Sequence, residues 1–486
     1  MSIKVHAVTT FGLAPIPVEV EVLATSGLPQ IKIIGAVSAS TREAKDRVVS
    51  ALKNLKVRLK ARKTMISLRA TELSKHDTGF DLAIAVGLLA LHQQLAFPLA
   101  SIVFIGEVSL EGEILPVPGC LAKVLAAKQL GFTKVVIPFK SLEQVNLVDN
   151  VTIYALKSLS ELLTGQLGSV IKPTQGLPKL YYQAIDLHLQ LLVNQQEALR
   201  ALTIAIAGNH HLRLVGPPGI GKTVLPQLAK ILMPPLSKKS LVKVLAIHSL
   251  YHIDLPVEQL THPPFQMPAH SVTPNQLLGN FNRQQLGELS LAKHGILFFD
   301  ELSELSKPSL QIIKDVLERS TDHCLVIAAS NPCLCGYWKT GVRACRCSAA
   351  SRAQFDAKLS GSFLDRFDLH ASIVPTDIAP SQPTINLSQL QIQVQTARQN
   401  QELRYTTDTL FNGQLDLNQI AQHCRLPKNT QQLLRQAMTS LKLSLRAYQK
   451  TITVAQTIAD LESSQDITEA HLAEALNYRF EQSWDP

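Results

Sequence analysis

Hydrophobic and polar positions are spaced differently in successive parts of the chain. In residues 1–165, short apolar runs bounded by glycine predict strands, whereas two longer runs are typical of helices. The expected strands are Val18–Val22, Ile31–Ile34, Ile102–Ile105 and Val135–Ile137, and the expected helices are Ala36–Leu52 and Cys120–Leu130. This region is therefore expected to form an α/β domain.

The rest of the chain divides at segments rich in glycine and proline. Residues 166–180 are expected to be a linker, and residues 181–376 a second α/β domain. From 377 to 486, apolar residues recur at helical spacing, as at Leu433, Ala437 and Leu441, which predicts an all-helical C-terminal domain.

One segment of the second domain has the composition of a phosphate-binding loop. It follows an apolar strand, Leu212–Val215, and precedes a predicted helix that ends at Leu232. Its glycines let successive N–H groups turn toward phosphate oxygens, Lys222 supplies a positive charge, and Thr223 offers a hydroxyl to Mg²⁺. The expected nucleotide-binding residues are Gly216, Pro217, Pro218, Gly219, Ile220, Gly221, Lys222 and Thr223.

Two further polar positions complete the expected chemistry. A buried apolar strand ends at Asp300 and Glu301, where Asp300 would join Thr223 in holding Mg²⁺ and Glu301 would polarise the attacking water. Asn331 ends the next predicted strand and would orient that water. A glycine-rich turn without a ligand is the alternative, but the second motif argues against it. The sequence therefore predicts an ATPase that uses ATP and Mg²⁺.

Composition narrows the class of protein. With 46% apolar and 17% charged residues, the chain is typical of well-packed globular proteins. No apolar run approaches the length of a membrane span, and Leu82–Leu91 is expected to be a core helix. The N-terminus lacks the apolar core of a signal peptide. A cytoplasmic protein without a membrane partner is expected.

The net charge of +9 is unevenly distributed, because residues 41–70 hold ten Lys or Arg against Glu43 and Asp46. Within this stretch, apolar and basic residues alternate, which predicts a strand with one cationic face. One interpretation is a sheet edge protected by charge, and the other is a contact with nucleic-acid backbone. The alternating residues are Leu55, Val57, Leu59 and Ala61 against Lys56, Arg58, Lys60 and Arg62.

Four of the seven cysteines form two close pairs, Cys333 with Cys335 and Cys345 with Cys347. Paired cysteines in a cytosolic chain favour a metal over disulfides, and four thiolates suit a structural Zn²⁺. Four unligated thiols on an exposed loop are the alternative.

The order of motifs resembles the AAA+ motors of the magnesium-chelatase group. Phe363-Leu-Asp-Arg366 is similar to their arginine-finger segment, and Arg446 to their second sensor arginine. Over nearly its whole length the chain resembles the ComM/YifB family, on motifs such as Gly79-Phe-Asp-Leu-Ala, Gly106-Glu-Val-Ser-Leu-Glu-Gly and Thr457-Ile-Ala-Asp-Leu. The resemblance implies a Lon-protease-like α/β domain, an AAA+ P-loop domain and a helical lid domain.

The same resemblance implies a hexameric ring that remodels DNA by branch migration, a helicase activity used in recombination during natural transformation. The DNA would be branched or single-stranded and bound without regard to sequence. In the Lon-like domain, Asp81 stands at the position of the protease's serine and Leu121 at that of its lysine. Leucine cannot act as a base and Lys123 is a poor substitute, so a non-proteolytic accessory role is expected.

One departure from the family weakens the expectation of DNA translocation. Between the predicted helix Leu310–Glu318 and the strand at Val326, the family usually inserts a β-hairpin, and this chain has only Arg319–Leu325. Two other readings therefore stay open. One is a chelatase-type motor acting on a protein or metal-insertion partner, and the other an ATP-switched DNA-binding module without translocation.

Overall fold

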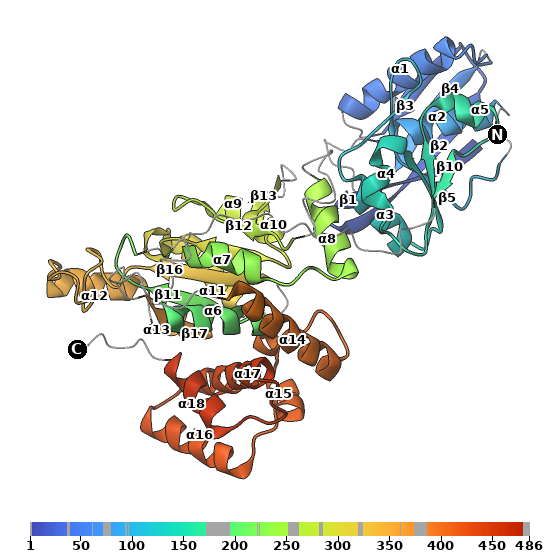
Figure 1. Cartoon of the computed structure of the whole chain (residues 1–486). Helices are drawn as coiled ribbons and strands as arrows, with labels where there is room; N and C mark the ends of the chain where they lie inside the picture. The colour runs from blue at the N-terminus through green and yellow to red at the C-terminus, as the bar shows by residue number, and fades with distance from the viewer. Residues whose placement is uncertain are drawn as a thin grey trace. The chain divides into compact units, whose positions relative to one another are not determined.

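The computed structural model of the chain describes residues 2–35, 39–60, 62–70, 79–92, 95, 97–171, 195–220, 222, 224–250, 262–280, 285–318, 324–359, 361–373 and 386–479. These fall into two compact units (Figure 1). Within the described residues, no helix has the length and apolar character needed to cross a bilayer.

The first unit is built on a mixed eight-stranded sheet in the order β10-β9-β8-β5-β1-β2-β4-β3. It contains all four strands expected from the apolar runs, and α2 is the expected core helix. The strands are β1 (Ser2–Phe11), β2 (Ala14–Thr25), β3 (Gln30–Ile34), β4 (Lys63–Arg69), β5 (Ile102–Phe104), β8 (Lys134–Pro138), β9 (Thr152–Leu156) and β10 (Ser169–Ile171). The main helices are α1 (Ala39–Asn54), α2 (Asp81–Leu91) and α3 (Cys120–Gln129). Residues 36–38 of the first expected helix lie outside the described part.

The strand expected at 55–62 is wrong. α1 ends at Asn54, Lys56 has a positive φ of 57°, and residues 57–60 pair with none of the described strands. Regular pairing begins only at Lys63, in β4. The alternation itself is real, because Leu55, Val57 and Leu59 pack against the core while Lys56, Arg58, Lys60 and Arg62 are exposed. Alternation marks an extended backbone, but pairing depends on a neighbouring strand. A guarded sheet edge is thereby excluded for residues 57–60, and Ala61 lies outside the described residues.

The second unit is built on five parallel strands in the order β12-β15-β16-β11-β17. Both faces of this sheet are buried. In β15, Ile296 and Phe298 join one apolar cluster, and Leu297 and Phe299 join the other. The strands are β11 (Leu212–Val215), β12 (Phe265–Gln266), β15 (Ile296–Phe299), β16 (Leu325–Ser330) and β17 (Leu369–Ser372).

Helices pack on this sheet and continue into a helical C-terminal part. α6 (Gln196–Gly208) and α7 (Val224–Leu232) share one apolar cluster with α14 and α17, whereas α11 (Lys307–Glu318) contributes to the other. The expected helical end of the chain is observed. Its helices are α14 (Leu387–Tyr405), α15 (Leu417–His423), α16 (Lys428–Ser440), α17 (Leu445–Leu461) and α18 (Glu469–Asn477).

One helix groups differently from its place in the sequence. α8 (Lys238–Ser249) falls inside the range expected for the ATPase domain, yet it belongs to the first unit. It packs against α3, and Gly119 N–H donates to the carbonyl of Ser249 at 2.8 Å. The chain therefore leaves the second unit after α7 before it returns at β12.

Candidate functional site

Strand order brings the predicted catalytic motifs to one edge of the five-stranded sheet. The phosphate-binding loop follows β11, Asn331 follows β16, and Asp300 and Glu301 follow β15. These strands are parallel neighbours, so their carboxyl ends meet at the same edge. β16 lies between the other two, which places Asn331 between the loop and the acidic pair.

Three polar side chains form one hydrogen-bonded group at this edge. Lys222 Nζ donates to Asn331 Oδ1 at 2.5 Å and to the carbonyl of Gly216 at 3.0 Å. Asn331 Nδ2 donates to Glu301 Oε2 at 2.6 Å, and the Asn331 backbone N–H donates to Glu301 Oε1 at 3.2 Å. The direct distance from Lys222 Nζ to Glu301 Oε2 is 3.9 Å. Asn331 therefore links the cation to the carboxylate.

Burial disfavours the charged form of Lys222. The Lys222 side chain is only 9% exposed, and that burial lowers its pKa, against the opposing pull of Glu301 and Asp300. A buried ammonium gains stability from a nearby anion, so a triphosphate fits here. In the loop itself, Gly219 has φ +82°, a conformation that favours glycine, and a Cβ placed on it would meet nothing within 4 Å. Gly221 and Thr223 lie outside the described residues.

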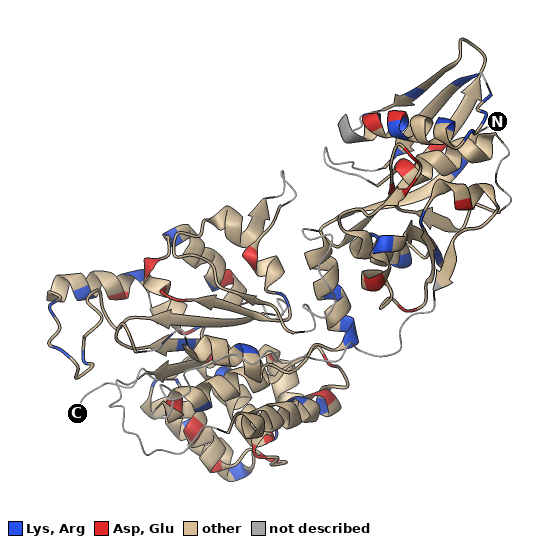
Figure 2. Cartoon of the chain, turned by 45° about the horizontal axis from the view of Figure 1, so that its top comes forward, with Lys and Arg blue, Asp and Glu red and all other residues tan. Residues whose placement is uncertain are grey.

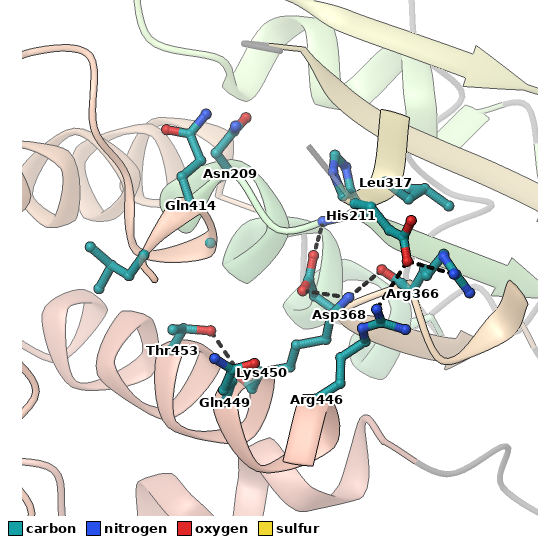
Figure 3. A pocket seen from close by; sticks show the side chains of 13 residues that line it. Asn209, His211, Leu317, Arg366, Asp368, Gln414, Arg446, Gln449, Lys450 and Thr453 are labelled. Carbon is teal, nitrogen blue, oxygen red and sulfur yellow. Dashed lines mark hydrogen bonds and ion pairs between the residues drawn. The ribbon is translucent and has the colours of Figure 1, made fainter. Parts of the chain in front are cut away.

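The two predicted arginines lie apart from this group and close to one another. They line a cavity of about 380 Å³ that lies within the second unit and is also lined by residues of α11 and α17 (Figure 3). Arg446 donates to Glu318 Oε1 at 2.9 Å, and Arg366 donates to the same oxygen. Glu318 ends α11, and a single glutamate at a helix end carries no sequence signature, which is why sequence reasoning missed it.

The four clustered cysteines meet as predicted. Their sulfur atoms all lie within 4.8 Å of one another, and the closest pairs are 3.4, 3.6 and 3.7 Å apart. Sulfurs around a tetrahedral zinc with Zn–S of 2.3 Å would be about 3.8 Å apart. Backbone N–H groups of Trp338 and Cys335 donate to Cys333 and Cys347, each at 3.3 Å. The cluster is therefore compatible with a bound metal.

In the first unit, Asp81 is fixed by an ion pair. Its carboxylate is 2% exposed, accepts from Arg47 Nε at 2.8 Å and from the Val108 backbone N–H at 3.2 Å. Leu121 is fully buried in α3, and Lys123 is 6% exposed. Asp81 and Leu121, which stand where Lon proteases have their serine and lysine, are thus both buried.

Comparison with known proteins agrees with the order of these motifs. Residues 188–379 match the family model described as magnesium chelatase, subunit ChlI, and residues 20–141 match subunit ChlI of Mg-chelatase. Residues 386–479 match the C-terminal model of the same subunit. The fold and motifs thus define a magnesium-chelatase-like AAA+ protein, a class that implies ATPase activity with ATP and Mg²⁺.

Two relatives match over almost the whole chain. YifB of Escherichia coli is 31% identical, covering 98% of this chain and 96% of its own length. The competence protein ComM of Haemophilus influenzae is also 31% identical, covering 98% and 97%. A shorter match, 32% identical over 20% of this chain and 17% of the relative, is to Lon protease 2 of Bacillus subtilis. The chain belongs to the YifB/ComM family of magnesium-chelatase-like AAA+ proteins.

Proposed function

We propose that the chain hydrolyses ATP at the group formed by Lys222, Asn331 and Glu301. Lys222 would bind the β- and γ-phosphates, and Asp300 with Thr223 would hold Mg²⁺. Glu301 and Asn331 would hold and polarise the attacking water. The hydrogen-bonded chain through Asn331 is the observation that carries this proposal, because it joins the phosphate-binding cation to the general base.

The second part of the proposal is that ATP turnover needs a ring of subunits, expected to be hexameric. Arg366 and Arg446 converge on Glu318 and bond neither to Lys222 nor to Glu301. Two cations held at one cavity can serve a phosphate presented by an adjacent subunit, where they would stabilise the charge of the transition state. Hydrolysis would then rise with protein concentration.

The third part is that the motor remodels DNA, by branch migration in homologous recombination during natural transformation. The competence name of the Haemophilus relative supports this role. Exposed Lys56, Arg58, Lys60 and Arg62 make no ion pair with a described residue, so phosphates could replace their hydrating water. Figure 2 shows that neighbouring α1 carries both basic and acidic residues. Because the four cations would contact phosphates and not bases, DNA binding would be salt-sensitive and indifferent to sequence.

The test is unwinding of a four-way DNA junction by purified protein, with and without ATP, beside the variant Glu301→Gln. ATP-dependent unwinding by the wild type alone supports the proposal. DNA binding with hydrolysis but no unwinding would identify an ATP-switched module, and hydrolysis without DNA binding would favour a chelatase-type protein partner. Absence of hydrolysis in assembled protein would refute the ATPase assignment.

We also propose a role for the cysteine cluster and one for the Lon-like domain. The four cysteines hold a Zn²⁺, since their sulfur spacing suits a tetrahedral ion. The site is structural, because four cysteine ligands leave no coordination position for water. The Lon-like domain is a non-proteolytic accessory, because a buried, ion-paired Asp81 offers no nucleophile. We place the protein in the cytoplasm, where thiols stay reduced.

A further inference from the structure

The cysteine cluster adjoins the ATP site along the chain. Cys333 lies two residues after Asn331, whose side chain contacts both Lys222 and Glu301. From there to α12 (Ala349–Lys358), residues 331–348 contain no helix or strand. A loop of this length without secondary structure needs another source of order. Four cysteine ligands to one metal would provide it.

The same loop touches the phosphate-binding loop. Gly336 is buried, and a Cβ placed on it would lie 2.5 Å from Pro218 Cδ and 3.6 Å from Asn331 Oδ1. The Pro218 ring is closed onto its own backbone nitrogen, so it cannot rotate away as a flexible side chain would. Gly336 therefore packs directly on the Pro218 ring, which belongs to the loop that would cradle the phosphates.

Gly336 is also fixed relative to the cluster. Its N–H donates to the carbonyl of Cys333 at 2.9 Å, and Cys335 precedes it in sequence. On the far side of the loop, Arg352 stacks on Trp338 with 3.9 Å to the ring centroid and donates to the Cys347 carbonyl at 2.8 Å. Movement of the cysteines would consequently move Gly336 and Asn331.

We propose that the metal held by Cys333, Cys335, Cys345 and Cys347 keeps this loop against Pro218, so that tight ATP binding requires the metal. This inference rests on the proposed ATPase function. With the metal removed, the four sulfurs lose their common ligand and Gly336 separates from Pro218, so the phosphate-binding loop loses the packing that holds it in place. The metal thereby regulates the nucleotide site without touching the nucleotide.

The first test removes the metal and measures nucleotide affinity. Zinc is displaced from the full chain by an organomercurial, which is then removed with dithiothreitol and a chelator before Mg²⁺ is restored. Affinity for a fluorescent ATP analogue is compared before and after, and again after addition of Zn²⁺. We expect about one zinc per chain and a rise in Kd of about tenfold or more, equal to about 1.4 kcal/mol, that zinc reverses. Circular dichroism checks that the fold persists.

The second test keeps the metal and changes only the contact. Gly336→Ala leaves all four cysteines in place but pushes on Pro218, whereas Gly341→Ala adds the same methyl group with nothing within 4 Å. Both glycines have positive φ, +82° and +72°, so backbone strain is matched. We expect Gly336→Ala to weaken ATP binding with zinc retained, and Gly341→Ala to bind as the wild type.

The outcomes separate the ideas. Native protein without zinc, or metal-depleted protein that binds ATP as tightly as the native form, would overturn the inference. Equal weakening by both alanine variants would also overturn it, because strain and not the Pro218 contact would be the cause. Zinc-containing wild type that binds no ATP would instead refute the proposed function on which the inference depends.

Discussion

Asn331 offers a sharp test of the catalytic assignment, because in Asn331→Ala both of its hydrogen-bond partners, Lys222 and Glu301, keep another hydrogen bond. Lys222 keeps its bond to the Gly216 carbonyl, and Glu301 keeps the Ser303 hydroxyl. Folding should therefore be preserved. The variant loses a bond to a cation and a bond to a carboxylate, at 2.5 and 2.6 Å. Each hydrogen bond to a charged group contributes about 1.5–3 kcal/mol.

Only the bond to Glu301 should count in the transition state, since Lys222 turns to the phosphates when ATP binds. The expected loss is thus about 1.5–3 kcal/mol, or about 10- to 150-fold in kcat. Affinity for ATP should stay the same or increase, because Lys222 loses an internal competitor. Single-turnover hydrolysis gives the first quantity and titration with a fluorescent analogue the second.

A matched control is Asn400→Ala, which removes a longer, neutral bond to the Asp460 carbonyl at 3.5 Å. That variant should hydrolyse ATP as the wild type. If Asn331→Ala keeps the wild-type kcat, the side chain does not serve the water and the reasoning fails. The same holds if the variant loses affinity for ATP while its kcat is unchanged.

Other outcomes follow from the same structure. Lys222→Ala should abolish nucleotide binding, and Glu301→Gln should preserve binding but block hydrolysis; wild-type turnover by the latter would contradict its role. Arg366→Ala should bind ATP yet turn it over poorly. Mixing it with Lys222→Ala subunits should restore activity at interfaces where one subunit supplies Lys222 and its neighbour supplies Arg366. Full activity in a verified monomer would exclude a site shared between subunits. Burial lowers the pKa of His210 from 6.5 to about 4, so as the pH falls His210 takes up a proton in the unfolded chain before it does so in the folded one. The free energy of unfolding should therefore decrease as the pH falls from 6.5 to 4, by about 1.4 kcal/mol per pKa unit. Urea unfolding at several pH values tests this, and a free energy of unfolding that does not change over this range would contradict it. Reversing the four exposed cations to Glu should weaken DNA binding and flatten its salt dependence, while hydrolysis without DNA persists. These cations are Lys56, Arg58, Lys60 and Arg62. Unchanged affinity for DNA would show that the DNA contact lies elsewhere.

Local pattern predicted most of what the strands position. β15 and β16 are continuous apolar runs, and the polar residues that follow each run fall at the carboxyl edge of the sheet. The edge location of Asp300, Glu301 and Asn331 therefore followed from the sequence. Features that depend on distant parts of the chain escaped prediction. α8 joins the first unit through α3, and Glu318 binds two arginines that follow it by 48 and 128 positions.

The sequence predicted that only a short segment connects α11 to β16. α11 ends at Glu318 and β16 begins at Leu325, as the sequence indicated within one residue. Residues 319–323, where the family hairpin would be inserted, lie outside the described residues. The consequence of that short connection for translocation stays a prediction.

The ion pair between Arg47 and Asp81 restricts how this domain can change in evolution. Lon proteases need a serine at this position, but a serine here would withdraw the carboxylate that Arg47 contacts twice, at 2.8 and 3.1 Å. Arg47 would keep its ion pair with Glu43 at 3.9 Å but lose both bonds to the buried carboxylate, so a first substitution toward peptidase chemistry would cost stability before the missing lysine could arise. The contact that holds this domain together thus also opposes a return to peptidase chemistry, because the first step on that path removes a buried ion pair.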